Sequence, residues 1–199
     1  MAHFEAHATP FVCATIVGKN AHERMKLATN WLQYWLKFQK RCKQVGTVIF
    51  DIDDTLIYLS QKNNTEIQIG AICQIFHLCK KLGFSRHIVT ARPESRANRE
   101  YTETMLTNKG LDNYEELYMM PSSIKPTLAG VSTYKYNARR EISKTHRIIA
   151  NVGDMWHDHM RFPLCKTMRS IGNLSETECA ILFPSDEFGQ VSLKVSGRM

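Results

Sequence analysis

The sequence predicts an α/β fold built on a mainly parallel sheet. Short runs of β-forming residues, such as residues 47–52, alternate along the chain with longer segments of helical periodicity. Alternation of this kind is typical of a parallel sheet covered by helices. In addition, several of the apolar runs end directly in polar residues. Ligand sites of open α/β sheets lie beyond the carboxyl ends of their strands, so these polar residues mark a candidate site.

The first 20 residues give no clear element, and the first predicted helix covers residues 20–43. Apolar residues recur there at helical spacing and form a broad face that includes Met25, Trp31 and Leu36. The tryptophans of this helix fit a core or docking role better than a ligand box.

The remaining elements follow from turn signals and strand-like runs. Gly46 precedes the strand at 47–52, and Gly83 and Gly110 mark the ends of two helices. Pro93 suits the first position of a helix. After the first strand we predict, in order, a polar loop at 57–65, a helix at 66–82, a strand at 86–90, a helix at 93–109, a strand at 117–120, a loop at 121–134, a helix at 135–145, strands at 147–152 and 179–184, a turn at 186–189 and a short edge strand at 190–195.

The composition indicates one globular protein with a sizeable core. The chain has 199 residues, of which 43% are hydrophobic and 23% charged. No stretch approaches the 18 apolar residues of a transmembrane helix, and residues 1–20 lack the pattern of a secretory signal. The six cysteines form no CxxC pair, which favours reduced thiols over a disulfide framework. We therefore expect an intracellular, cytoplasmic protein with no membrane partner.

The formal net charge of +7 predicts anionic partners. A positive field attracts phosphorylated small molecules, nucleotides and nucleic-acid ends, although ordinary solubility explains the same charge. A local basic cluster at Lys37, Lys40, Arg41 and Lys43 lies at the end of the first predicted helix. This cluster suits either the negative end of the helix dipole or a nucleic-acid patch.

Three carboxylates stand within four residues where the predicted strand at 47–52 ends: Asp51, Asp53 and Asp54. Asp51 and Asp53 point the same way from an extended chain, roughly 6–7 Å apart, which leaves room for a tetrahedral group. Two like charges about 4 Å apart repel by roughly 4 kcal/mol at an effective dielectric near 20, so such a cluster needs a cation. Oxygen ligands suit Mg²⁺. The alternative is an acidic turn that caps a helix.

Polar residues also follow two later strands. Thr90 and Arg92 come after the strand at 86–90, next to a predicted helix N-terminus, where anions bind readily. The alternative for Thr90 is a helix N-cap. Asp154 and Asp158 follow the strand at 147–152, four residues apart, so one helical turn places them on one face. The neighbouring histidines are too close in sequence to converge on zinc, and no fourth ligand is evident.

Together these segments resemble the haloacid dehalogenase (HAD) superfamily. Its first motif, Asp-x-Asp-x-Thr, stands at residues 51–55, its second at Thr90, and its last at residues 153–158. The lysine motif has two candidates, Lys135 and Lys144, and the resemblance favours Lys135. The segments at 90–95, 134–139 and 151–158 are similar to the class B acid phosphatase and vegetative storage protein group, subfamily IIIB. The resemblance covers about residues 46–160.

The resemblance implies a three-layer Rossmann-like fold with a central, mainly parallel sheet. Only 38 positions separate Asp51 from Thr90, enough for a flap over the carboxylates and one helix. The loop at 121–134 is also too short for a large insertion, so we expect a minimal cap domain or none. We divide the chain into an N-terminal helical extension that packs on the core, residues 1–45, and a HAD-like catalytic domain, residues 46–199.

The implied activity is Mg²⁺-dependent hydrolysis of phosphomonoesters through an aspartyl-phosphate. Asp51, expected to be ionised at neutral pH, would be the nucleophile, and Asp53 the general acid and then the base. Mg²⁺ would bind Asp51, Asp154 and the main-chain carbonyl of Asp53, with Asp158 nearby. The phosphoryl oxygens would be bound by Thr90 and Lys135, whereas Arg92 would either touch the substrate or anchor its own loop.

Two further functions remain open on the sequence. A polynucleotide-end or nucleotide phosphatase fits the net charge of +7 and the expected lack of a cap. A non-catalytic HAD-like binding or storage protein would use the fold without turnover, but the presence of Asp51 argues against it.

Overall fold

The computed structural model of this chain describes residues 14–15, 21–162, 181–183 and 191–194. Its elements, in chain order, are β1 (Ala14–Thr15), α1 (Ala21–Arg41), β2 (Thr47–Phe50), β3 (Ile57–Ser60), β4 (Thr65–Gln68), α2 (Gly70–Leu82), β5 (Ser85–Glu94), α3 (Arg96–Asn108), β6 (Glu116–Pro121), α4 (Leu128–Ser143), β7 (Ile148–Gly153), the 3₁₀ helix η1 (Trp156–Asp158), β8 (Ile181–Phe183) and β9 (Val191–Lys194).

One seven-stranded sheet organises the protein, with the strand order β1-β8-β9-β7-β2-β5-β6. The five strands from β9 to β6 are parallel, and β8 and β1 add an antiparallel edge. Strand β2 lies between β7 and β5, and all four of its residues are buried. The α/β fold with a mainly parallel sheet is therefore confirmed.

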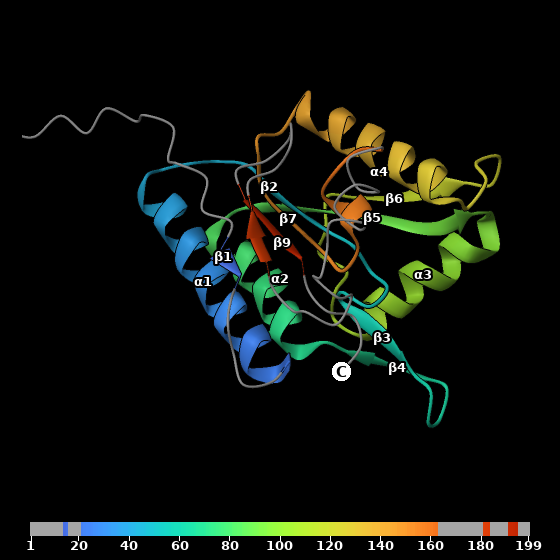
Figure 1. The fold of residues 1–199 in the computed structure, drawn as a ribbon, viewed down its shortest axis with the longest axis horizontal. Helices are drawn as coiled ribbons and strands as arrows, with labels where there is room; N and C mark the ends of the chain where they lie inside the picture. Colours follow the sequence, from blue (N-terminus) through green and yellow to red (C-terminus); the bar gives the residue numbers. More distant parts are fainter. Residues whose placement is uncertain (1–13, 16–20, 163–180, 184–190, 195–199) are drawn as a thin grey trace, which may run out of the picture.

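Helices cover both faces of the sheet and complete three layers (Figure 1). On one face, apolar side chains of α1, α2 and α3 pack with the sheet into a large core, to which α1 contributes Met25, Ala28, Leu32 and Leu36. On the other face, α4 packs over a smaller cluster. The division at residue 45 remains a prediction, since the core is continuous with α1. Within the described residues, no helix combines the length and apolarity that crossing a bilayer requires.

A short hairpin replaces the predicted loop at 57–65. Strands β3 and β4 pair antiparallel, and α2 begins at Gly70 instead of residue 66. The turn contains Asn64 with a positive φ of 53°, a conformation that asparagine tolerates better than most residues. Ile57 and Ile69 anchor the hairpin in the core. Only this hairpin separates the carboxylates after β2 from α2, which confirms the expectation of a minimal cap.

The boundary between β5 and α3 lies later than predicted. Strand β5 continues to Glu94 with a shift in register between Thr90 and Pro93, and α3 begins at Arg96. Ser95 caps α3 because its side chain accepts a hydrogen bond from the Asn98 main-chain N–H. The prediction that Pro93 starts the helix is wrong, because the serine two residues later is the better cap. Thr90 thus lies inside a strand and does not cap a helix.

The opposite error occurs at α4, which begins at Leu128 and so includes half of the predicted loop at 121–134. Thr127 caps it by accepting a hydrogen bond from Gly130 N. The sequence does not reveal that α4 starts at Leu128, because Gly130 and Ser132 are poor helix formers. Burial of Val131 in the core outweighs their low helix propensity. As a result, Lys135 lies in the second turn of a helix and not at its beginning.

The C-terminal strands occupy an unexpected place. Strands β8 and β9 correspond to the predicted strands at 179–184 and 190–195, and the turn predicted at 186–189 lies outside the described residues. Strand β9 is not at an edge, because it pairs parallel with β7 on one side and antiparallel with β8 on the other. The sequence distance between β7 and β9 concealed this non-local pairing.

Candidate active site

Three carboxylates from two strand ends converge on one point. Asp51 follows β2, Asp154 follows β7, and Asp158 ends η1 just beyond. Each offers a ligand atom within 4.8 Å of the others. The convergence arises because β2 and β7 are parallel neighbours, so their carboxyl ends lie side by side. An all-oxygen set of this kind suits a hard divalent cation such as Mg²⁺.

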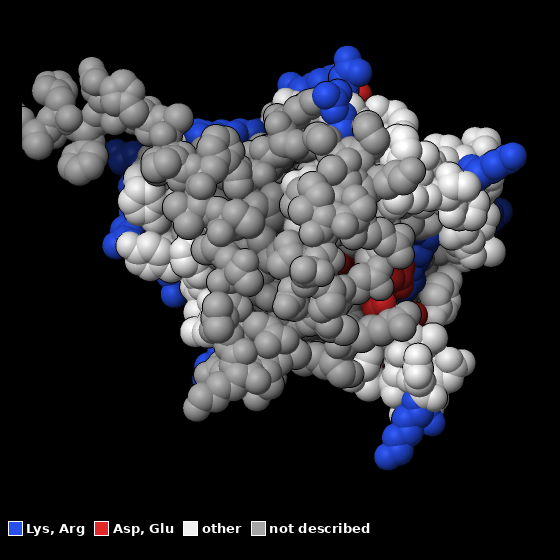
Figure 2. All heavy atoms as spheres, viewed as in Figure 1, with Lys and Arg blue, Asp and Glu red and all other residues white. Residues whose placement is uncertain are grey.

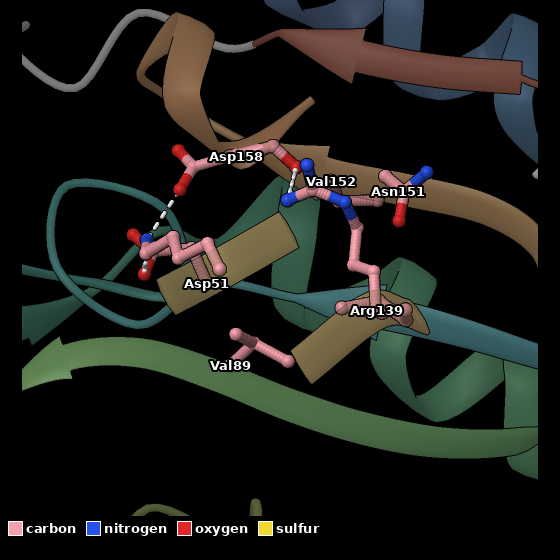
Figure 3. Close-up of a pocket in the computed structure, with 8 residues that line it drawn as sticks. Asp51, Val89, Arg139, Asn151, Val152 and Asp158 are labelled. Atoms are coloured by element: carbon pink, nitrogen blue, oxygen red, sulfur yellow. Dashed lines mark hydrogen bonds and ion pairs between the residues drawn. The ribbon is translucent and has the colours of Figure 1, made fainter. Parts of the chain in front are cut away.

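Lys135 of α4 reaches into this cluster and contacts Asp51 and Asp158, two carboxylates that line the pocket in Figure 3. Its Nζ lies 2.7 Å from Asp51 Oδ1 and also contacts Asp158 Oδ1. Its side chain is only 3% exposed. The other candidate, Lys144, caps the end of α4, pairs with Glu141 and is 60% exposed. Only Lys135 of these two therefore lies with the carboxylates.

The loop after β7 is shaped so that Asp158 folds back over the strand end. A Cβ on Gly153 would lie 2.4 Å from Asp158 Cβ, so no side chain fits there. Asp158 Oδ2 accepts a hydrogen bond of 2.8 Å from Met155 N. His159 is fully buried beside the Gly153 carbonyl oxygen, and burial lowers its pKa to about 3. The converging group consists of three aspartates.

The charges of the cluster are unbalanced without a cation. Burial raises the pKa of Asp51 to about 7 and that of Asp154 to about 9, and the neighbouring carboxylates add to both shifts. Burial would also raise the pKa of Asp158, but Lys135, with smaller contributions from His157 and His159, holds that pKa below its ordinary value. Burial opposes the charge of Lys135, but Asp158 and Asp51 raise its pKa above the usual range. Full ionisation of Asp51 at neutral pH therefore requires a further positive charge.

Asp53 differs from Asp51 in both exposure and partner. Its side chain is 57% exposed and forms a two-pronged ion pair with Arg92, with Nη2 2.7 Å from Oδ1 and Nε 3.0 Å from Oδ2. Arg92 also approaches Glu66 of the hairpin at 3.7 Å, and Tyr101 donates a 2.8 Å hydrogen bond to the same glutamate. Between α3 and the hairpin, Figure 2 shows acidic and basic atoms together at the surface.

Sequence reasoning missed Glu66 because it lies in a segment assigned to a loop and helix. The signal was present in the adjacent asparagines, Asn63 and Asn64, which favour a turn between two strands. Alternation places Glu66 and Gln68 on the same side of β4. A hairpin assignment would therefore have brought an acidic side chain into consideration.

The remaining predicted residues lie around this centre. Thr55 Oγ1 is 3.5 Å from Asp51 Oδ2, in the turn that follows β2. Thr90 is fully buried within the neighbouring strand β5, just before its shift in register, and its hydroxyl accepts a hydrogen bond from Arg92 N. Arg92 binds Asp53 and Glu66, so its expected contact with phosphate remains a prediction. The side chain of Asp53 is not among the converging ligands, and the role of its main-chain carbonyl also remains a prediction.

Comparisons with solved structures find partial matches at low sequence identity. A chain titled "Structure of Pnkp1/Rnl/Hen1 complex" is 18% identical, with a TM-score of 0.49, over 64% of this chain and 44% of that one. The present chain thus spans less than half of that protein. An uncharacterized protein from Listeria monocytogenes serotype 4b is 21% identical, with a TM-score of 0.40, over 56% of this chain and 68% of that one. No curated protein sequence matches.

A family model gives the decisive match. The model of the HAD superfamily, subfamily IIIB (acid phosphatase), matches residues 59–171, which is more than half of the chain. The matched range includes Thr90, Lys135, Asp154 and Asp158, and the carboxylates after β2 lie just before it. The family is one of phosphoric monoester hydrolases, in agreement with the acidic centre at the strand ends. The chain therefore belongs to the HAD superfamily, subfamily IIIB, the acid phosphatases.

Proposed function

We propose that the protein is an Mg²⁺-dependent phosphatase that hydrolyses phosphomonoesters through an aspartyl-phosphate on Asp51. The observation that carries the proposal is the convergence of Asp51, Asp154 and Asp158 within 4.8 Å, with Lys135 against Asp51. A carboxylate beside a cation site and a buried ammonium group suits phosphoryl transfer, whose catalysis depends mainly on positioning and on charge stabilisation.

The residues present fit a magnesium ion. The side chains of Asp51, Asp154 and Asp158 and the main-chain carbonyl of Asp53 would hold it through oxygen alone. When bound, the ion would neutralise part of the carboxylate charge and of the phosphate charge. It would thereby lower the raised pKa values of Asp51 and Asp154, which burial and mutual repulsion cause.

In the proposed first step, an Asp51 carboxylate oxygen attacks phosphorus and the bond from phosphorus to the ester oxygen breaks. Protonated Asp53 gives its proton to the departing ester oxygen. In the second step Asp53, now ionised, accepts a proton from a water molecule that attacks the aspartyl-phosphate, which releases inorganic phosphate and restores Asp51. Lys135 and Thr90 would bind the phosphoryl oxygens throughout.

The ion pair between Asp53 and Arg92 sets a condition on this mechanism. Both carboxylate oxygens of Asp53 accept hydrogen bonds from Arg92, so neither is free to face a departing ester oxygen. Asp53 must therefore leave Arg92 before it acts as an acid. Because its side chain is 57% exposed, rotation away from Arg92 displaces no core packing.

The test is hydrolysis of p-nitrophenyl phosphate by the full chain with and without Mg²⁺, followed by D51N. Activity should require the metal and disappear in D51N, while the control D112N, an exposed carboxylate outside the site, should keep wild-type rates. Burst kinetics with a phosphorylated intermediate should accompany turnover. Turnover by D51N at the wild-type rate would refute the assignment of the nucleophile.

A second candidate is a phosphatase for polynucleotide ends or nucleotides. The observations that favour it are the net charge of +7 and an insert after β2 that is only a two-stranded hairpin, which leaves space for a bulky substrate. Oligonucleotides with 3′- or 5′-terminal phosphates should then be hydrolysed faster than free nucleotides. Equal or slower hydrolysis would count against this candidate. Nucleic-acid binding without turnover of any phosphomonoester would instead support a non-catalytic binding protein.

A further inference from the structure

Helix α4 presents two buried cations to the candidate site from one face. Lys135 and Arg139 are one helical turn apart, and they are only 2% and 1% exposed. Lys135 contacts carboxylate side chains, whereas Arg139 contacts the main chain that carries one of them. Helix α4 thus contacts both the carboxylates of the site and the main chain of the loop that bears Asp158.

Two hydrogen bonds from Arg139 reach the last two residues of η1. Its Nη1 donates a hydrogen bond of 2.8 Å to the main-chain oxygen of Asp158 and one of 3.3 Å to that of His157. In Figure 3 the Arg139 side chain extends toward the segment that bears Asp158, on the side of Asn151 and Val152. The two hydrogen bonds fix the backbone from which the Asp158 carboxylate projects.

Asp158 is held at three points as a result. Arg139 holds its main chain, Met155 N holds one carboxylate oxygen at 2.8 Å, and Lys135 holds the other. Met155 belongs to the same short loop and moves with it, so the hydrogen bond from Met155 N cannot fix the loop relative to the sheet. The two contacts from α4 can, because α4 packs against the sheet through its own core.

A purely structural role for Arg139 is the alternative. A buried guanidinium costs several kcal/mol of desolvation, and an apolar side chain of similar volume often serves stability as well or better. A merely structural arginine could therefore be replaced by methionine without consequence for the carboxylates. Arg139 lies one helical turn from Lys135 and donates a hydrogen bond to the main chain of Asp158. This placement favours a role in the candidate site over a purely structural one.

We propose that Arg139 is a positioning residue, which holds the loop of residues 154–158 so that its two carboxylates meet Asp51 around the cation. The proposal rests on the proposed function, because it assumes that the cluster binds Mg²⁺. Residues that support metal ligands typically change metal affinity or activity 10- to 100-fold when they are replaced.

The experiment compares R139M and R139K with the wild type by Mg²⁺ titration calorimetry, thermal unfolding and hydrolysis of p-nitrophenyl phosphate. R139M should bind Mg²⁺ about 10- to 100-fold more weakly. Its kcat should recover as the Mg²⁺ concentration rises, while its KM for the ester at saturating metal changes little. R139K, which keeps one cationic donor, should restore part of the affinity.

The matched control is R86M. Arg86 is also a buried arginine, but its guanidinium lies 4.6 Å from the centre of the Phe76 ring in another part of the core. R86M should bind Mg²⁺ within about twofold of the wild type, whatever change in unfolding temperature it shows, because Arg86 lies near the start of β5 against Phe76, whereas the loop lies beyond the end of β7. The pair separates loss of stability from loss of positioning.

Wild-type Mg²⁺ affinity in folded R139M would overturn the proposal. If R139M does not fold, R139Q takes its place, and wild-type affinity in that variant has the same meaning. Equal weakening by R86M and R139M would also overturn it, because the effect would then follow from stability alone. A wild-type protein that binds no Mg²⁺ and hydrolyses no ester would instead refute the proposed function itself.

Discussion

Asp51 and Asp53 are two residues apart on one strand end, yet their surroundings are opposite. The side chain of Asp51 is 7% exposed and pairs with Lys135, which is 3% exposed. The side chain of Asp53 is 57% exposed and pairs with Arg92 at the surface. One pair is closed off from water and the other remains open to it.

The comparison shows how residues after one strand can supply one carboxylate that is held in place, Asp51, and another that can move, Asp53. Removing one partner of a buried ion pair leaves an uncompensated charge and costs about 3–5 kcal/mol, whereas an exposed pair contributes about 0–1 kcal/mol. Asp51 is therefore held in one position, and Asp53 can exchange partners at low cost. A nucleophile benefits from the first property and a proton carrier from the second.

The largest effect should come from D51N. The amide cannot form the acyl phosphate, so kcat should fall on the order of 10⁵-fold or more, as when a nucleophile is removed from other covalent enzymes. Steady-state hydrolysis of p-nitrophenyl phosphate measures this loss. A fall of less than about tenfold would remove the distinction between the two aspartates.

D53N should have the next largest effect. Loss of a general acid and base typically costs about 10²–10⁴-fold in rate, so kcat should fall within that range. Because protonation of a good leaving group matters less, the loss should be smaller for p-nitrophenyl phosphate than for an alkyl phosphate. An equal loss for the two esters would contradict the role of Asp53 as an acid.

K135M tests the buried side of the comparison through stability. Without Lys135, Asp51 and Asp158 lose their buried partner, so the free energy of unfolding should fall by about 3–5 kcal/mol at pH 8 without metal. Urea unfolding measures it. Mg²⁺ or a lower pH should reduce the loss, since both remove negative charge. K144M on the same helix, whose lysine is 60% exposed, should stay within about 0.5 kcal/mol of the wild type.

The pH dependence of Mg²⁺ binding tests whether the buried carboxylates, Asp51 and Asp154, hold protons that the cation displaces. The pKa of Asp154 is raised to about 9 and that of Asp51 to about 7, chiefly by burial. A raised folded-state pKa means that the folded protein holds the proton more tightly, so stability without metal falls as the pH rises toward these values. Mg²⁺ replaces the proton, and its affinity should rise by up to about tenfold per pH unit for each proton displaced.

The measurement is the gain in Tm on adding Mg²⁺, which should be larger at pH 8.5 than at pH 6. In D154N one of the two titrating carboxyls is gone, so the gain should be smaller and should depend less on pH. A gain that is independent of pH in the wild type would mean that the cation binds without displacing protons.

The smallest effect should come from R92M. Its ion pair with Asp53 is partly open to water, and such pairs contribute at most about 1 kcal/mol, so unfolding in urea should change by that amount or less. The difference should shrink further at high salt. A loss above about 2 kcal/mol would show that the Arg92 pair is as structural as the Lys135 pair, and the comparison would fail.

The sequence allowed prediction of the parts of the site that depend on strand order alone. Asp51, Thr90 and Asp154 each follow an apolar run, and carboxyl ends of parallel strands meet at one edge, so their proximity follows from local patterns. The choice of Lys135 came from family resemblance, because its position depends on how α4 packs across the sheet.

The features that could not be predicted depend on tertiary contacts. The link from Arg92 to Glu66 requires the hairpin to fold toward β5, and no local pattern sets that direction. The early start of α4 reflects burial of Val131 against helix propensity. The place of β9 beside β7 joins residues about 40 positions apart, a pairing that periodicity does not encode.

The position of β9 has a consequence for how the site comes into being during synthesis. Strand β7, which delivers Asp154, keeps its outer edge unpaired until residues 191–194 have left the ribosome, because β9 is the strand that pairs with it. The residues of the candidate site all precede β9 in the chain. The sheet that holds them therefore gains this neighbour of β7 only after residues 191–194 have been synthesised, and termination before residue 191 would leave β7 without it.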